Sequence, residues 1–203
     1  KTLDPEKTNV EEIISLMLGK LPRQKKPLKI SAPKHQNPIL KIKHLSNKKE
    51  LKDVSLEICS GEIVGITGLI GSGKSQIGRI LFGIDRLKKG RIIFDGLELD
   101  SISPQQAIRN KIFFSPEDRN TQGLFLDFET YKNITITALE KVQDKFGLKK
   151  NKEIDFAIKN SQFLGLKPLN ISLRARHMSG GNQQKVVFAK WLHLQPRLLI
   201  LDE

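Results

Sequence analysis

One stretch of this chain has the residue types and the spacing of a phosphate-binding loop. It follows the pattern G-x-x-x-x-G-K-[ST] and consists of Gly68, Leu69, Ile70, Gly71, Ser72, Gly73, Lys74 and Ser75. The glycines let the backbone approach phosphate oxygens, so that amide N–H groups and the positive end of a following helix face the anion. We expect Lys74 to reach the β- and γ-phosphates of a nucleotide and Ser75 to ligate Mg²⁺, with Gln76 bordering the same site.

Two carboxylates follow the apolar run 198–201. A continuous apolar run of this length is typical of a buried strand, and ligands of open α/β sheets bind where such strands end. Asp202 is therefore expected to hold Mg²⁺ through water, and Glu203 to orient or deprotonate an attacking water. The predicted catalytic residues are thus Glu203 and Lys74.

A second glycine-containing turn opens a helical pattern farther along the chain. It comprises Ser179, Gly180, Gly181, Asn182 and Gln183. The first N–H groups of a helix have no partner within the helix, and together with the helix dipole they attract anions. Because one domain rarely needs two phosphate sites, this turn distinguishes the chain from most nucleotide binders. We assign its five residues to nucleotide binding as well.

The elements that must position these residues alternate between strand and helix. Short apolar or alternating runs predict strands at 39–45, 54–58, 62–67, 91–94, 112–114 and 198–201, with a hairpin turn at Asp95-Gly96. Helical patterns occupy 74–82, a short segment opened by Ser103 and Pro104, much of 132–164, and 181–193. This order predicts an α/β fold that combines a parallel sheet, an antiparallel piece at the front and a helical insertion.

The first part of the chain differs from the rest in charge and composition. The 203 residues carry a net charge of +13, and ten basic residues but no acidic one lie between Lys20 and Lys49. That stretch also holds four of the nine prolines and no aromatic residue, which favours a solvated linker over a nucleic-acid site. Before it, an amphipathic pattern over residues 8–19 predicts one helix, which we expect to pack on a preceding domain.

Composition also limits the class of protein. No apolar run approaches the roughly 18 residues that are needed to cross a bilayer. The single cysteine, Cys59, rules out an intramolecular disulfide and fits a reducing compartment. We assign Cys59 no chemistry.

The three motifs together resemble those of ATP-binding-cassette (ABC) ATPases, whose Leu-Ser-Gly-Gly-Gln signature corresponds here to residues 178–182. Residues 38–203 are also similar to the second cassette of the tandem ATPase subunit of bacterial monosaccharide importers, the ribose/galactose/xylose type. That similarity is carried by Ser115-Pro116-Glu117-Asp118-Arg119, Gln122-Gly123-Leu124, and the segments 180–187 and 189–192. It implies a P-loop NTPase core with an antiparallel β subdomain and a helical signature subdomain at about 120–190.

The resemblance also divides the chain. First cassettes of this kind end in a Met-x-Gly-(Arg/Lys) helix, matched by residues 17–20, so residues 1–20 are expected to be the C-terminal helix of a preceding cassette. Residues 21–37 are then a basic linker, and 38–203 a cassette that is incomplete at its C-terminus, without the D-loop and the switch histidine. In this fold the next strand lies between 62–67 and 198–201. We therefore expect these two segments to share no ladder bonds, and the isolated fragment to be inactive.

The resemblance implies an ATPase that uses ATP and Mg²⁺ to energise uptake of a monosaccharide. The expected partners are a second cassette, transmembrane permease subunits at the cytoplasmic side of the cell membrane and, indirectly, a periplasmic or lipoprotein sugar-binding protein. Nucleic acid is not expected. The alternatives are a half that binds ATP and dimerises without hydrolysing it, a cassette protein that acts on ribosomes or nucleic acid, and import of nucleosides or a furanose signalling molecule.

Three departures from the family pattern bear on hydrolysis. Second cassettes of such importers often carry Arg where this chain has Lys74, which indicates a competent phosphate loop here. Glu117 replaces the Q-loop glutamine, and because a carboxylate cannot donate as an amide can, we expect it to act in coupling to the membrane partner. The aromatic residue that usually stacks on adenine has no counterpart between Ser46 and Asp53.

Overall fold

The computed structural model describes residues 37–47, 50–99, 102–167 and 171–202. The predicted N-terminal helix, most of the basic linker and Glu203 lie outside these residues. Within the described ranges, no helix is both long and apolar enough to cross a membrane.

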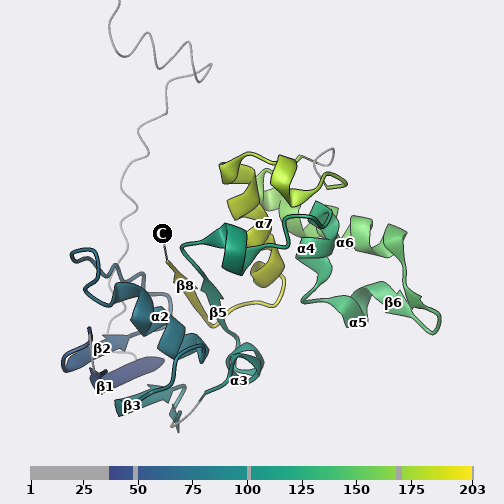
Figure 1. The fold of residues 1–203 in the computed structure, drawn as a ribbon. Coiled ribbons are helices and arrows are strands. Elements are labelled where there is room, and N and C mark those ends of the chain that lie inside the picture. Colours follow the sequence, from purple (N-terminus) through teal and green to yellow (C-terminus); the bar gives the residue numbers. More distant parts are fainter. Residues whose placement is uncertain (1–36, 48–49, 100–101, 168–170, 203) are drawn as a thin grey trace, which may run out of the picture. The chain divides into compact units, whose positions relative to one another are not determined.

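An antiparallel sheet of four strands, in the order β2-β1-β3-β4, precedes the parallel part of the fold (Figure 1). Its strands are β1 (Leu40–Ser46), β2 (Val54–Ile58), β3 (Lys89–Phe94) and β4 (Leu97–Glu98). The β3–β4 hairpin turns at Asp95 and Gly96, whose φ angles of 52° and 79° are both positive, as a tight two-residue hairpin turn requires. The predicted antiparallel piece and its hairpin are confirmed.

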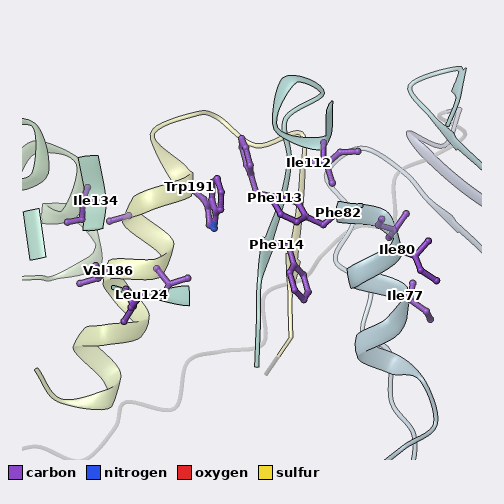
Figure 2. Packing of buried hydrophobic residues seen from close by; sticks show 14 of the residues in the cluster. Ile77, Ile80, Phe82, Ile112, Phe113, Phe114, Leu124, Ile134, Val186 and Trp191 are labelled. Carbon is purple, nitrogen blue, oxygen red and sulfur yellow. The ribbon is translucent and has the colours of Figure 1, made fainter. Parts of the chain in front are cut away.

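A parallel pair of strands forms the centre of the core. β5 (Ile112–Ser115) pairs with β8 (Leu198–Leu201). Successive side chains of a strand face opposite sides: Phe113 stacks on Trp191 of α7 (Gly180–Leu192) with 5.1 Å between ring centroids, whereas Phe114 lies 6.0 Å from Phe82 of α2 (Lys74–Phe82). Figure 2 shows the strand pair between these two helices. The two helices that begin at the predicted nucleotide motifs therefore pack on one shared strand.

The remaining helices follow the predicted pattern with two interruptions, one at residues 136–138 and one between α5 and α6. They are α3 (Pro104–Arg109), α4 (Thr130–Thr135), α5 (Leu139–Val142) and α6 (Lys150–Ser161), with shorter turns η1 (Arg119–Gly123), η2 (Gln162–Leu164) and η4 (Ala175–His177). Between α5 and α6, β6 (Gln143–Asp144) and β7 (Gly147–Leu148) form a small hairpin. Gly147 has a φ of 106° in this turn, a conformation that L side chains rarely adopt. A glycine therefore splits the helical pattern expected over 132–164.

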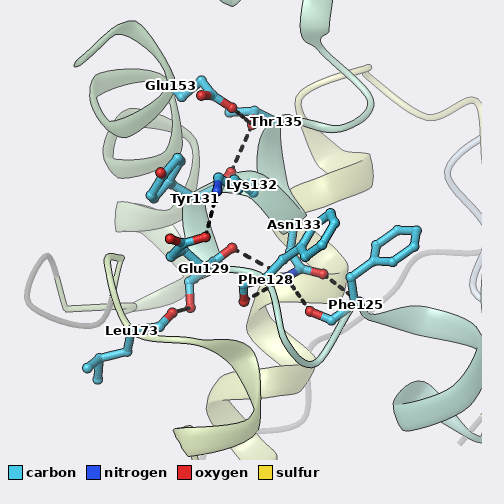
Figure 3. A network of polar contacts seen from close by, with 10 residues as sticks. Phe125, Phe128, Glu129, Tyr131, Lys132, Asn133, Thr135, Glu153 and Leu173 are labelled. Carbon is cyan, nitrogen blue, oxygen red and sulfur yellow. Dashed lines mark hydrogen bonds and ion pairs between the residues drawn. The ribbon is translucent and has the colours of Figure 1, made fainter. Parts of the chain in front are cut away.

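A buried asparagine holds the insertion to the segment that leads into it (Figure 3). The side chain of Asn133 on α4 is almost fully buried; its Oδ1 accepts from the backbone N–H of Phe125 at 2.8 Å, and its Nδ2 donates to the Phe125 carbonyl at 3.0 Å. On the same helix, the Thr135 hydroxyl donates to the buried carboxylate of Glu153 on α6 at 2.9 Å. Buried polar groups that find partners in this way fix one arrangement of the helices.

The segment 62–67, predicted as a strand, does not form one. Ile63 and Ile66 have 79% and 47% of their surface exposed, and in the described part of the chain β8 pairs only with β5. A cavity of about 930 Å³ is lined by this segment and by β8. An extended segment needs a neighbouring backbone for its ladder bonds, and in the described residues 62–67 pairs with no strand. The strand prediction is wrong for this structure, whereas the prediction that 62–67 and 198–201 share no ladder bonds is confirmed.

Candidate functional site

The phosphate loop leads directly into α2, as the sequence predicts. Gly73, the residue before the helix, has a φ of 88°, and a Cβ placed there would lie 2.8 Å from Leu51 Cδ2. Only glycine fits both the backbone angle and the space. The side chain of Lys74 folds across the loop, and its Nζ donates to the carbonyls of Gly68 (2.7 Å) and Leu69 (2.9 Å). The ammonium group is thereby held at the mouth of the loop.

Ser75 and Asp202, 127 residues apart in sequence, meet at the start of α2. The Ser75 hydroxyl donates to Asp202 Oδ1 at 3.0 Å. Hydroxyl and carboxylate oxygens are ligands that Mg²⁺ prefers, and Mg²⁺ usually takes one or two protein ligands together with phosphates and water. The two residues predicted as metal ligands therefore fit a single Mg²⁺ ion. In the described residues there is no group of three or more His, Cys, Asp and Glu that would form a larger site.

The loop is supported from the turn that connects β1 and β2, through a residue that sequence reasoning missed. Asn47 Nδ2 donates to Gln76 Oε1 at 2.8 Å, while Asn47 Oδ1 accepts from the backbone N–H groups of Glu50 and Leu51. An asparagine that binds the backbone three and four residues on is typical of a turn, which is the signal that was available. A second cavity, of about 330 Å³, opens beside Asn47, Glu50 and Gln76.

An arginine follows Ser75 on the next turn of α2. Arg79 binds both carboxylate oxygens of Asp85, with Nε–Oδ2 and Nη2–Oδ1 distances of 2.7 and 3.1 Å. The hydrogen bond to Asp85 raises the pKa of Arg79, and the charge of Asp202 adds to the shift. The guanidinium of Arg79 is therefore hydrogen-bonded to Asp85, while its positive charge also interacts with Asp202, the predicted metal ligand.

The second predicted nucleotide motif forms the exposed start of α7. Ser179 is the N-cap, its side chain makes no capping hydrogen bond, and the first turn of the helix carries no acidic residue. A Cβ on Gly181 would meet nothing within 4 Å, so this turn opens to solvent. Because α2 and α7 flank the β5–β8 pair (Figure 2), the two motifs occupy separate places.

Two predicted site residues are placed differently from the others. Gln183 is 8% exposed, and both ends of its amide bind within the chain: Oε1 accepts from Arg119 Nε and Nε2 donates to the Ala175 carbonyl. Its side-chain amide is therefore held within the chain, and its assignment to nucleotide binding stays a prediction. Glu117 is exposed just before η1 and lies two residues after Ser115, whose carbonyl accepts from the Asp202 N–H. Glu203 lies outside the described residues.

The far end of α7 carries two buried ionisable groups. Burial lowers the pKa of Lys190 to about 8 and the pKa of His193 to about 4, the latter with a contribution from the charge of Lys141. Lys190 Nζ donates to the Gly123 carbonyl at 2.6 Å. The Thr137 hydroxyl donates to the Lys190 carbonyl at 2.6 Å and lies 2.8 Å from His193 Nε2. Both groups support α7 rather than the exposed motif.

With this geometry in place, comparison with known proteins decides the family. The profile of the ABC transporter family matches residues 51–203. The chain belongs to the ABC transporter family. It is an ATP-binding cassette, and the predicted P-loop fold with an antiparallel β subdomain is confirmed by solved cassettes. The cassette MJ1267 in its ADP conformation matches with a TM-score of 0.67 and 20% identity, over 81% of this chain and 68% of that one.

Curated relatives of the cassette are ribose import ATPases. The chain is 36% identical to the ribose import ATP-binding protein RbsA of Bacillus subtilis (strain 168), over all of this chain and 41% of the relative. RbsA 2 of Rhizobium johnstonii is 37% identical over 98% of this chain and 38% of the relative. The chain thus spans about two fifths of the length of these relatives. A dimeric bacterial cassette, MJ0796, shares the fold with a TM-score of 0.66 and 23% identity, covering 81% and 73% of the two chains.

Proposed function

We propose that this chain is the nucleotide-binding part of the second cassette of a tandem ATPase, which hydrolyses ATP to energise uptake of a monosaccharide. The observation that carries the proposal is the 3.0 Å contact between Ser75 and Asp202, since it joins the phosphate loop to the end of a parallel strand. The similarity to ribose import ATPases supports the class of cargo. Residues 1–20 would then end a preceding cassette, with 21–37 as the linker to the cassette at 38–203.

The proposed binding step starts from the contacts that Lys74 makes now. Its ammonium group exchanges the carbonyls of Gly68 and Leu69 for the β- and γ-phosphate oxygens of ATP, while the amide groups at the start of α2 face the same anion. The other loop residues, Ile70, Gly71, Ser72 and Gly73, shape this cradle, and Gln76 borders it. Ser75 and Asp202 would hold Mg²⁺, which would neutralise the phosphate charge.

The proposed hydrolytic step needs a base next to this site. Glu203 follows Asp202 directly, so its carboxylate would accept a proton from the water that attacks the γ-phosphate. Ser179, Gly180, Gly181 and Asn182 would contact the ATP bound to the phosphate loop of the other cassette. The exposure of this turn and the free N–H groups of α7 support that role.

The remaining partners follow from the same proposal. Permease subunits would hold the cassette at the cytoplasmic side of the membrane, with Glu117 in the coupling segment, and a periplasmic or lipoprotein sugar-binding protein would deliver the cargo. The apolar cavity between 62–67 and β8 would take a further strand of the longer protein, since it leaves Ile63 and Ile66 exposed.

A second candidate is a half that binds ATP and dimerises without turnover. It is favoured by Glu117 in the Q-loop position and by the lack of an aromatic residue between Ser46 and Asp53. Within the importer class, nucleosides or a furanose signalling molecule are the alternative cargoes. Uptake assays with labelled ribose, galactose, xylose and a nucleoside in cells lacking the protein distinguish these cargoes.

The test of nucleotide binding is Lys74→Ala in the complete tandem protein with the other phosphate loop disabled. Loss of charge-assisted hydrogen bonds worth about 1.5–3 kcal/mol should weaken binding of labelled ATP by roughly 10- to 150-fold. Lys159→Ala, an exposed lysine on α6, is the matched control and should bind ATP like the wild type. Unchanged affinity in Lys74→Ala contradicts the phosphate-loop assignment.

A further inference from the structure

Gln183 joins the start of α7 to two other segments. Its backbone N–H donates to the Ser179 carbonyl at 2.9 Å, as the first turn of a helix requires. Its side-chain Nε2 donates to the carbonyl of Ala175 at 3.0 Å, in the turn just before Ser179, and its Oε1 accepts from Arg119 Nε at 3.2 Å. One buried amide therefore holds the residues on both sides of the exposed Ser179–Asn182 turn.

Arg119 packs directly on that turn. A Cβ on Gly180 would lie 2.7 Å from Arg119 Nη2, so the guanidinium plane occupies the space that any larger residue at 180 would need. Among the described residues, Arg119 forms no ion pair with a carboxylate, and Gln183 is the partner that fixes its side chain. An alanine at position 180 would therefore require the guanidinium end of Arg119 to shift.

The segment that carries Arg119 is itself anchored at both ends. Asp118 caps η1: its Oδ1 accepts from the N–H groups of Asn120 and Thr121, and its Oδ2 accepts from the Thr121 hydroxyl at 2.6 Å, the contact that most lowers the pKa of Asp118. At the other end Lys190 binds the Gly123 carbonyl. Arg119 thus belongs to a segment that is also attached to α7 through Lys190, about two helical turns after the exposed Ser179–Asn182 turn.

We propose that Arg119 is a positioning residue, which with Gln183 fixes the Ser179–Asn182 turn in the geometry that receives the nucleotide of the opposite cassette. The expected effect on turnover rests on the proposed function, whereas the expected effect on the structure of the Ser179–Asn182 turn does not. Because η1 begins two residues after Glu117, a displacement of η1 would reach the Ser179–Asn182 turn through the guanidinium of Arg119. The planar fork of Arg serves two contacts at once, Nε to Gln183 and Nη2 over Gly180, which Lys cannot do.

The experiment uses the complete tandem protein and the variants Arg119→Ala, Arg119→Lys, Gln183→Met and the double variant Arg119→Ala/Gln183→Met. Arg109→Ala, on the exposed end of α3, is the matched control. Loss of positioning should lower kcat by about 10- to 100-fold, while the affinity of residues 68–75 for labelled ATP stays within about 2-fold, since those residues are not touched. Arg119→Lys should not restore kcat. The loss of kcat in the double variant should be smaller than the product of the two single losses, because both changes remove the same Arg119–Gln183 contact.

A second readout is hydrogen exchange without nucleotide. In Arg119→Ala the amides of residues 180–183 should exchange roughly 10-fold faster, with exchange in α6 unchanged. Faster exchange together with a wild-type protein that does not hydrolyse ATP supports the positioning and contradicts the proposed function. Unchanged exchange, wild-type kcat, effects of the two single changes that multiply, or rescue by Lys overturns the inference. If Arg119→Ala fails to fold, Arg119→Lys and Gln183→Met decide by the same measurements.

Discussion

Two helices of this cassette begin at exposed glycine-containing turns, and their surroundings differ. At the start of α2, Lys74 is held over the loop carbonyls and Ser75 binds the carboxylate of Asp202. At the start of α7, Arg119 lies on Gly180 and is held by an uncharged amide, that of Gln183. Neither first turn carries an acidic residue of its own, so within each helix no side chain of the first turn opposes the positive end of the dipole.

The difference shows that the two starts have complementary chemistry. The first combines a cation with oxygen ligands, so it suits a nucleotide that is bound together with Mg²⁺. The second offers N–H groups and a guanidinium that, in the described part of the chain, forms no ion pair with a carboxylate, so it suits an anion whose metal is supplied elsewhere. This is the division of labour expected if each cassette completes the site of the other.

The largest effect is expected from a change in the proposed catalytic base next to the start of α2. Glu203→Gln keeps the shape of the side chain and removes the base, so turnover by the complete protein should fall by about 10²–10⁴-fold while ATP binding survives. Steady-state hydrolysis with the other cassette disabled measures this, and Glu140→Gln on α5 is the exposed control. Equal turnover in Glu203→Gln and wild type would mean that this half does not hydrolyse ATP through Glu203.

A smaller effect sharpens the comparison of the two glycine turns. Gly73 has a φ of 88° and Leu51 Cδ2 at 2.8 Å from its Cβ position, so Gly73→Ala should lower the free energy of unfolding by about 1–3 kcal/mol. Gly181 has open space around it and a helical position, so Gly181→Ala should leave stability unchanged or raise it by up to about 1 kcal/mol. Denaturant titration of the two variants side by side tests the contrast, and equal losses would contradict it.

The smallest effect concerns the ends of the helices. The C-cap of α2 is Gly83, whereas the C-cap of α7 is His193, whose Nδ1 is buried without a partner in the described residues. Thr137 donates its proton to a carbonyl, so His193 Nε2 carries the hydrogen and protonation of Nδ1 would bury a charge.

The pKa of His193 therefore falls from its ordinary value of 6.5 to about 4. The unfolded chain takes up a proton first, so stability should decrease as pH falls from about 6.5 to about 4. His193→Gln should remove about 1 kcal/mol of this loss, after allowance for solvent screening. Unfolding at pH 7 and pH 5 measures it, with exposed His177→Gln as the control; an undiminished acid loss in His193→Gln contradicts the assignment.

Much of this site followed from local patterns in the sequence. The phosphate loop needs glycines and a lysine in a fixed order before a helix, and the four apolar residues before Asp202 indicate a buried parallel strand. These patterns placed Ser75 and Asp202 at one edge correctly, although 127 residues separate them. The cap residue Ser103 and the first-turn Pro104 likewise located the start of α3, where the structure adds a capping box with Gln106.

Other features depend on contacts that no local pattern reports. Gln183 has a polar side chain of the kind that binds ligands. Only the fold shows that Arg119, 64 residues earlier, donates a hydrogen bond to its amide oxygen. The segment 62–67 has the alternation of a strand, but a strand also requires a partner backbone, which the sequence of the segment itself does not reveal. The register of η1 against α7, set by Lys190 and Gly123, is equally a property of the packed structure.

The stacking of Trp191 on Phe113 has an optical consequence. Trp191 is the only tryptophan in these 203 residues, is 8% exposed, and lies where α7 meets β5. Its emission should therefore be that of an apolar environment and should report the separation of the helical insertion from the strand pair. Lys190 Nζ lies 5.1 Å from the centre of the same ring and has a pKa of about 8, so the intensity of that emission records, between pH 7 and pH 9, whether the ammonium group beside the ring is charged.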